Sequence, residues 1–205
     1  VNYLLTFNYW FGNIYLIKYF STEINYLKSD DNKKDLEYLI NLLPEYFFLI
    51  PASSTGKYHP KFAGTVSGLV KHTKVAVRIA YDLFETVNNF SDNDKDLIIM
   101  ALVLHDGLKK GIVEEKYTRH DHPLLVCDFI RENSNLSDDD IELVVRMISS
   151  HMGIWNTDFK GNEVLPKPED KYQRFVHMCD FLASRKFLNV NFDGIDIIEW
   201  YRLIF

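Results

Sequence analysis

Hydrophobic residues recur at helical spacing along most of the chain, and polar or turn-forming segments separate the periodic stretches. The spacing predicts helices over about 33–48, 67–89, 94–108, from 123 onward, over 137–151 and over 170–188. We find no internal repeat or low-complexity tract. The pattern therefore predicts an all-α fold in a single domain.

Local signals at the ends of these stretches refine the prediction. Pro44 is expected to kink or split the first helix, because its ring cannot be accommodated in a helix interior. Ser137 and the acidic residues after it are a strong start signal for the helix over 137–151. Asp92 or Asn93 is expected to cap the helix over 94–108. The candidate start residues of a short terminal helix are Asp193 and Asp196.

The apolar character of the N-terminal residues raises the question of a membrane span or a signal peptide. Residues 1–20 are rich in apolar and aromatic side chains, but polar residues interrupt them before a run reaches the roughly 18 apolar residues of a membrane span. No basic segment followed by a small-residue cleavage site marks a signal peptide. We expect no membrane association. We expect residues 1–50 to form an N-terminal segment, beginning as strand or helix, that packs on the main body.

Composition limits the functional class. The chain has 205 residues, of which 47% are hydrophobic and 25% charged, as in a globular protein with a substantial core. A net charge of −6 argues against binding an extended nucleic-acid duplex. Two cysteines, Cys127 and Cys179, are too few for a disulfide framework, so a reducing, cytoplasmic location is expected.

Residues of metal-ligand type recur at wide intervals, and most of them lie on the apolar faces of predicted helices. They are His72, His105, Asp106, His122, His151 and Asp180. An unpaired carboxylate on such a face is costly or must stay protonated, and a buried metal centre would satisfy all these groups together. Imidazole and carboxylate favour Fe, Mn, Co, Ni or Zn over Ca or Cu(I). Six ligands exceed the usual set of one catalytic ion, so we expect two divalent ions bridged by Asp106.

Each residue also has a simpler interpretation. A single histidine on an apolar face is more often a hydrogen-bonded core residue than a ligand. His120, two residues before His122, is an alternative ligand at that point of the chain. His177, three residues before Asp180, faces either the site or the surface. The convergence of several helices on one centre is what favours the metal hypothesis.

The motifs that carry these ligands resemble those of a known superfamily. Gly68-Leu-Val-Lys-His72-Thr, Ala101-Leu-Val-Leu-His105-Asp106-Gly-Leu-Lys109, His122, Ser150-His151 and Cys179-Asp180 are similar to the HD-domain phosphohydrolases over about residues 51–188. The resemblance implies a helical bundle with a metal centre in its core, formed by residues 51–205. It also implies that His72, His105, Asp106 and Asp180 hold one ion, and that His122 and His151 complete a second.

Within this superfamily, the segment from Pro51 through His59 to His72 is similar to the lead-in of bacterial HD-domain 3′-to-5′ exoribonucleases. Those enzymes usually carry two adjacent glycines where this chain has Ser67-Gly68. They also bear an N-terminal OB-type domain, for which about fifty residues are too few. These departures favour a smaller phosphoester substrate over processive RNA degradation.

The resemblance implies a metal-dependent phosphohydrolase that cleaves a phosphoester of a nucleotide or short oligonucleotide with metal-activated water. Asp106 and Lys109 are the candidate catalytic residues. Lys109 follows His105 by one helical turn, so it reaches the same end of the site. Arg185 and Lys57 are further candidates for substrate binding, with solvated surface charges as the simpler interpretation.

Two other functions share the same ligands. Some HD-fold proteins with the six-ligand set are di-iron oxygenases that cleave C–C or C–P bonds. A non-catalytic HD module that binds a nucleotide or a partner is the third possibility. Lys109 and the exoribonuclease-like lead-in favour phosphate chemistry, and the full ligand set argues against a lapsed enzyme.

Overall fold

The computed structural model describes residues 16–53, 58–87 and 89–198, and helices predominate among them. The elements are η1 (Lys18–Phe20), α2 (Ser21–Ile24), α3 (Asp30–Leu42), α4 (Tyr46–Leu49), η2 (Lys61–Gly64), α5 (Gly68–Leu83), α6 (Asp92–Leu104), α7 (His122–Asn133), α8 (Asp138–Ser149), α9 (Lys171–Ala183), β1 (Phe192–Asp193) and β2 (Asp196–Ile197). Within the described ranges the sheet formed by β1 and β2 is the only one. The predicted all-α fold is confirmed.

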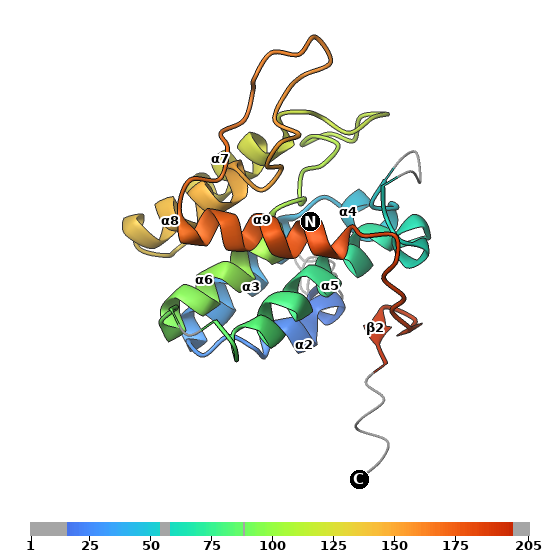
Figure 1. Cartoon of the computed structure of the whole chain (residues 1–205). Helices are drawn as coiled ribbons and strands as arrows, with labels where there is room; N and C mark the ends of the chain where they lie inside the picture. The colour runs from blue at the N-terminus through green and yellow to red at the C-terminus, as the bar shows by residue number, and fades with distance from the viewer. Residues whose placement is uncertain (1–15, 54–57, 88, 199–205) are drawn as a thin grey trace, which may run out of the picture.

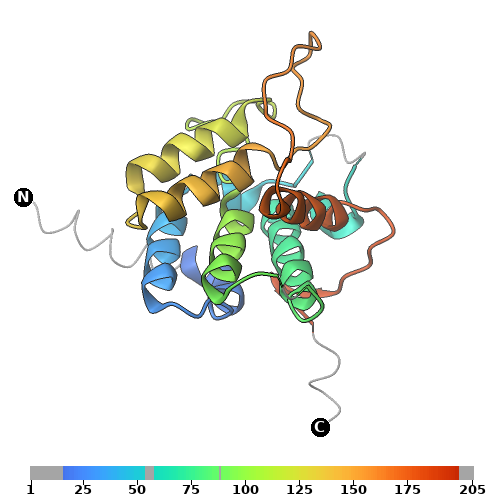
Figure 2. The same ribbon diagram turned by 60° about the vertical axis from the view of Figure 1, so that its left-hand side comes forward.

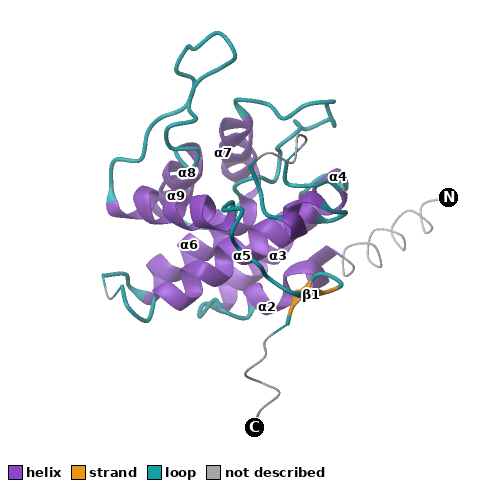
Figure 3. Ribbon diagram, turned by 45° about the vertical axis from the view of Figure 1, so that its right-hand side comes forward, coloured by secondary structure: helices purple, strands orange, loops and turns teal. Residues whose placement is uncertain are grey.

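Four helices form the centre of the bundle. α5 packs against α6 and α9, and α6 packs against α8 and α9. α9 lies across α5 and α6, while α7 packs on α8 at one side of the bundle (Figures 1 and 2). The two long connections, 105–121 and 150–170, project on the same side of the molecule, as the teal loops in Figure 3 show.

α6 is the most deeply buried element of the bundle. Every residue from Asp96 to Leu104 is buried, so the helix is covered on all sides rather than along one stripe. The helix ends at Leu104, and the next two residues are His105 and Asp106. Burial of α6 thereby carries this pair into the interior of the protein.

The start of α6 differs from the prediction. Its N-cap is Ser91, and neither Asp92 nor Asn93 has this role. The Ser91 hydroxyl accepts a hydrogen bond from the Asp94 backbone N–H, and the Asp94 carboxylate accepts one from the Ser91 N–H. This reciprocal capping box satisfies two backbone donors, whereas a side-chain cap alone would satisfy one.

Two other local signals had the expected effect. The Ser137 hydroxyl accepts a hydrogen bond from the Asp140 N–H, so Ser137 caps α8 as predicted. The helix predicted over 33–48 is split around Pro44: α3 ends at Leu42, and α4 begins at Tyr46.

The C-terminal ends of α5, α6 and α9 were placed too late, and α6 ends at Leu104 where 108 was predicted. α5 ends at Leu83, whose carbonyl accepts hydrogen bonds from the N–H and the hydroxyl of Thr86. α9 ends at Ala183, where the side chains of Ser184 and Arg185 donate to the Phe181 carbonyl. In both places a side chain donates a hydrogen bond to a backbone carbonyl near the helix end.

The terminal helix expected from Asp193 or Asp196 is wrong. Phe192 pairs with Ile197 and Asp193 with Asp196 in a short antiparallel hairpin. Gly194 in its turn adopts a φ of 62°, a conformation that glycine reaches at little cost. Glycine at the first of the two loop positions between Asp193 and Asp196 favours a tight hairpin turn, and here this preference outweighs the helix-start preference of aspartate.

The structure describes only part of the predicted N-terminal segment, residues 1–50. Residues 1–15 lie outside the described residues, whereas Phe20 in η1 is fully buried in the core. Among the helices that the structure describes, none combines the length and the apolar character needed to cross a lipid bilayer.

A buried ion-pair network joins the N-terminal elements to α5. The Lys74 ammonium lies 2.7 Å from the Glu23 carboxylate and 2.7 Å from the Tyr19 carbonyl oxygen, and both charged side chains are fully buried. Arg78, one turn further along α5, binds the other oxygen of Glu23 at 3.0 Å. These bonds fix α2 against the helix that carries His72.

We expect Glu23→Ala to lower the free energy of unfolding by about 3–5 kcal/mol, because it removes the buried partner of the Lys74 charge and leaves only the exposed Asp196 carboxylate, 3.6 Å away. The measurement is urea unfolding in the presence of a chelator, so that metal binding does not contribute. Asp31→Ala breaks an exposed pair with Lys34 and serves as the control, with an expected loss of about 0–1 kcal/mol. Equal effects of the two substitutions would contradict a stabilising role for the buried network.

Candidate metal centre

The six predicted ligand residues arrive at one place from five segments of the chain. His72 lies within α5 and Asp180 within α9, while the others lie at helix ends: His105 and Asp106 after α6, His122 at the start of α7 and His151 after α8. Five of the six are almost fully buried, and the Asp180 side chain is 18% exposed. The structure therefore brings together all six residues that the sequence analysis singled out.

Their ligand atoms form three overlapping groups in which all atoms lie within 4.8 Å of one another. The groups are His72 with His105 and Asp106, His105 with His151 and Asp180, and Asp106 with His122 and His151. The overlap means that His105, Asp106 and His151 each belong to two groups. Such sharing shows that the six residues surround one common centre.

Three of the histidines are oriented by their own backbone. In His105, His122 and His151, Nδ1 donates a hydrogen bond to the carbonyl three residues earlier. The acceptors, at 2.6, 2.7 and 2.8 Å, are the carbonyl oxygens of Leu102, Arg119 and Ile148. Because a carbonyl can only accept, Nδ1 carries the proton and the neutral ring has its lone pair on Nε2. Hydrogen bonding of the remote nitrogen is the usual support of a metal-binding histidine.

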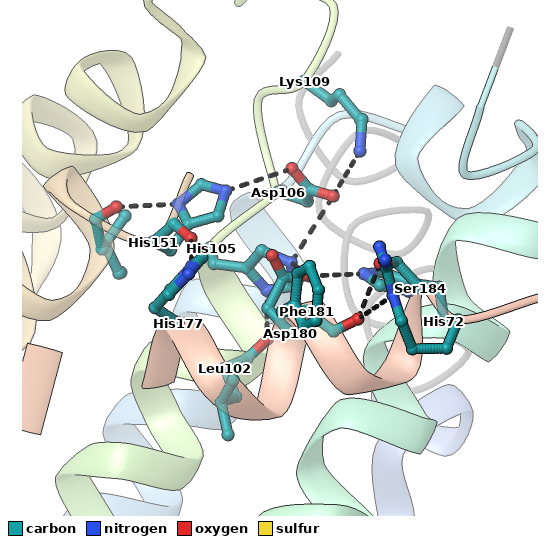
Figure 4. A network of polar contacts seen from close by, with 12 residues as sticks. His72, Leu102, His105, Asp106, Lys109, His151, His177, Asp180, Phe181 and Ser184 are labelled. Atoms are coloured by element: carbon teal, nitrogen blue, oxygen red, sulfur yellow. Dashed lines mark hydrogen bonds and ion pairs between the residues drawn. The ribbon is translucent and has the colours of Figure 1, made fainter. Parts of the chain in front are cut away.

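The Asp106 carboxylate lies between these rings. Its Oδ1 is 2.9 Å from Nε2 of His122 and 3.8 Å from Nε2 of His151. Its Oδ2 is 3.5 Å from Nε2 of His105 and 2.5 Å from the Lys109 ammonium. Figure 4 shows His151 and Lys109 directed at this carboxylate from different sides. The two oxygens therefore face two different sets of groups.

Asp180 completes the side of the centre that faces α5. Its Oδ1 lies 2.8 Å from Nε2 of His72 and 3.4 Å from Nε2 of His105. His72 differs from the three histidines above, because its Nδ1 has no hydrogen-bond partner among the described residues. Its orientation depends on Asp180 and on packing within α5.

Hydrogen bonds among the described residues leave several buried polar atoms of this centre unpaired. In the described part of the chain, Nε2 of His105, Nε2 of His122 and Oδ1 of Asp106 are buried and have no hydrogen-bond partner. The last two lie only 2.9 Å apart without hydrogen-bond geometry. Buried acceptors facing one another are costly, and a divalent cation satisfies them together. Nitrogen and oxygen donors in this combination fit a first-row transition metal.

The pKa values of the two carboxyl groups favour their charged forms. Burial acts to raise the pKa of Asp106, but the charges of Lys109 and His105 outweigh it and hold that pKa well below the usual range. Burial likewise opposes ionisation of Asp180, and the neighbouring imidazoles of His105 and His72 lower its pKa. The centre therefore offers two carboxylates to a cation at neutral pH.

The pKa values of His105 and His151 shift in opposite directions. Burial acts to lower the pKa of His105, but the neighbouring Asp106, with support from Asp180, raises it to about 10. For His151, burial and the positive charge of His105 lower the pKa to about 3. In the metal-free centre His105 is thus an imidazolium between two carboxylates, and His151 is neutral.

The remaining candidates occupy different surroundings. His120 is exposed, so His122 is the histidine of this pair that belongs to the centre. His177 donates from Nδ1 to the His151 carbonyl oxygen at 2.7 Å and thus supports the ligand loop. Arg185 lies with its guanidinium carbon 3.7 Å from the centre of the Phe181 ring, in the turn after α9. Lys57 lies outside the described residues.

One residue of the site was not identified from the sequence. His59 packs against His72 with 4.9 Å between ring centroids. Burial, followed by the charges of His72 and Lys109, lowers its pKa to about 3. His59 stands in a turn-forming segment without helical periodicity, so no face could be assigned to it. Its position in the lead-in to His72 was the one available signal.

A comparison with protein-family models finds the HD domain over residues 69–184, which contain all six converging residues. A search of curated proteins and a search of solved structures each gave no match.

Metal binding to this centre is expected to release protons. A pKa of about 10 means that His105 is protonated at pH 7 without metal, and it must lose that proton to present Nε2 to an ion. Affinity should therefore rise as the pH is raised from 6 towards 9. Titration of the metal-free protein with Mn²⁺ in buffers of different ionisation enthalpy should report release of about one proton per chain. A binding heat independent of the buffer would contradict this protonation state.

Proposed function

Because the chain belongs to the HD-domain family, whose members are generally metal-dependent hydrolases, we propose that it hydrolyses a phosphoester of a nucleotide or short oligonucleotide. The observation that carries this proposal is the convergence of six ligand residues around a buried carboxylate beside a lysine. The ligands account for metal binding, and the lysine accounts for the choice of a phosphorylated substrate.

We infer two ion positions, one on each side of Asp106. His72, His105 and Asp180 would hold the first ion together with Asp106. His122 and His151 would hold the second, facing Oδ1 of the same carboxylate. The separation of the groups around Oδ1 and Oδ2 supports a bridging role for Asp106. When bound, such ions activate water and neutralise charge that develops on phosphoryl oxygens.

Lys109 is the first phosphate-binding residue in this proposal. Its ammonium lies 2.5 Å from Oδ2 of Asp106, and the side chain is 12% exposed. A phosphate group bound next to Asp106 would therefore meet a positive charge already held at the centre. The partly buried position strengthens this interaction, because little water screens it.

Arg185 is the second cationic group. Its Nε donates to the Phe181 carbonyl oxygen and its Nη2 to the Ser184 hydroxyl, so the guanidinium is held in place by neutral partners. Among the described residues no carboxylate forms an ion pair with it. A guanidinium fixed in this way can bind phosphate through its remaining donors.

Trp155 supports a nucleotide as the phosphorylated group. Its indole stacks on Phe181, with 5.9 Å between ring centroids and 20° between ring planes, and it is 48% exposed. Phe181 also contacts His177, which donates to the His151 carbonyl oxygen, so this aromatic pair lies beside the ligand set. A half-exposed indole at that position can stack a nucleobase.

The proposal is tested by metal analysis and a substrate screen of the purified protein. We expect about two ions per chain, and phosphoester cleavage within a panel of nucleotides, cyclic nucleotides and short RNA with Mn²⁺, Co²⁺ or Fe²⁺. Asp106→Ala should lose both metal and activity, whereas Asp128→Ala, an exposed carboxylate on α7, should retain both. Oxygen uptake by the iron-loaded protein without phosphoester cleavage would favour the oxygenase alternative.

Lys109→Ala should lower kcat/KM for a phosphorylated substrate about 10- to 100-fold, the effect of losing one charge-assisted hydrogen bond. The metal content should not change, because Lys109 is not a ligand. Lys110→Ala is the matched control, since the neighbouring ammonium pairs with Glu114. Unchanged kinetics of the Lys109 variant would reject its role in phosphate binding.

A further inference from the structure

His59 lies beside the candidate metal centre but outside its ligand groups. Its ring meets the His72 ring edge-on, with a centroid distance of 4.9 Å and an interplanar angle of 79°. None of the three groups of ligand atoms found among the described residues contains it. His59 therefore contacts a ligand residue without taking part in the ligand set.

Three buried histidines of the centre have a structural hydrogen bond through Nδ1, whereas Nδ1 of His72 and of the partly buried His59 has none among the described residues. His105, His122 and His151 each donate from Nδ1 to a backbone carbonyl. Within the described ranges, neither nitrogen of His59 makes a hydrogen bond. Nδ1 is buried, whereas Nε2 is not. Nε2 is thus the nitrogen that a molecule entering the site can reach.

The contact with His72 indicates which part of the centre His59 faces. The ligand atom of His72 lies in one group with those of His105 and Asp106, and Oδ2 of Asp106 faces His105 and Lys109. His122 and His151 face the other carboxylate oxygen. His59 therefore approaches the centre from the side of His72.

We propose that His59 is a substrate-binding residue whose imidazole donates a hydrogen bond from Nε2 to a phosphate oxygen of the substrate. The inference rests on the proposed phosphohydrolase function and adds a specific residue to it. In this arrangement Lys109 supplies the charge, and His59 supplies a directional donor on the same side of the centre. A phosphate oxygen is the acceptor that this combination of donors recognises.

The test compares inorganic phosphate binding by the Mn²⁺-loaded wild-type protein and by His59→Ala, using calorimetry. His59→Ala should bind phosphate about 10-fold more weakly, the effect of one lost hydrogen bond, and should lower kcat/KM similarly. His59→Gln should recover most of the affinity, because its amide nitrogen can take the position of Nε2. His120→Ala replaces an exposed histidine and should leave phosphate binding unchanged. All variants should retain the wild-type manganese content and unfolding temperature.

The possible failures are distinguishable. If the wild-type protein binds phosphate and His59→Ala binds it equally well, the role of His59 is overturned and the proposed function stands. If His59→Ala loses manganese, the residue holds His72 in place and does not bind substrate, which also overturns the inference. If the wild-type protein neither binds phosphate nor cleaves any phosphoester, the proposed function falls and the role of His59 with it.

Discussion

A negative charge buried at Asp106 requires compensation from every side, and the surrounding elements supply it. Imidazole nitrogens of His105 and His122 approach the carboxylate, and the Lys109 ammonium lies against its Oδ2. Without a cation, His105 compensates by carrying a proton. A bound metal ion would replace that proton, and the ring nitrogen would then serve as a ligand. Protons and metal ions therefore compete for the same interior position.

The fold builds this centre largely from helix ends. Carbonyls in the last turn of a helix lack intrahelical partners, and a side chain that donates to one of them is held there. His105 donates to the carbonyl of Leu102 at the end of α6, and His151 to that of Ile148 at the end of α8. The Ile148 carbonyl also accepts backbone N–H bonds, so the His151 ring adds a further bond at that helix end, and in both histidines the bond directs Nε2 inward. The end of each helix therefore also determines the orientation of the candidate ligand that follows it.

Periodicity was sufficient to predict the main helices and to place most of the converging residues on buried faces, whereas His122 was included as a ligand-type residue at a helix start. A histidine or aspartate on an apolar stripe must enter the core with its neighbours, as His72 and Asp180 do. The details that escaped prediction depend on contacts distant in sequence or on competing local signals. Ser91 outcompeted Asp92 as a cap through its reciprocal bond with Asp94. The contact of His59 with His72 required the tertiary arrangement of a segment without periodicity.

The two sides of Asp106 differ in how firmly their groups are held. On the Oδ1 side, His122 and His151 are both anchored to backbone carbonyls and have no freedom to follow a substrate. On the other side, His105 is anchored in the same way, but Lys109 is joined to Asp106 by its charge, and His59 has no structural hydrogen bond in the described chain. Metal ligands need fixed positions, whereas substrate-binding groups must exchange one partner for another during turnover. This asymmetry is the physical reason to expect the phosphate group on the side of His59 and Lys109.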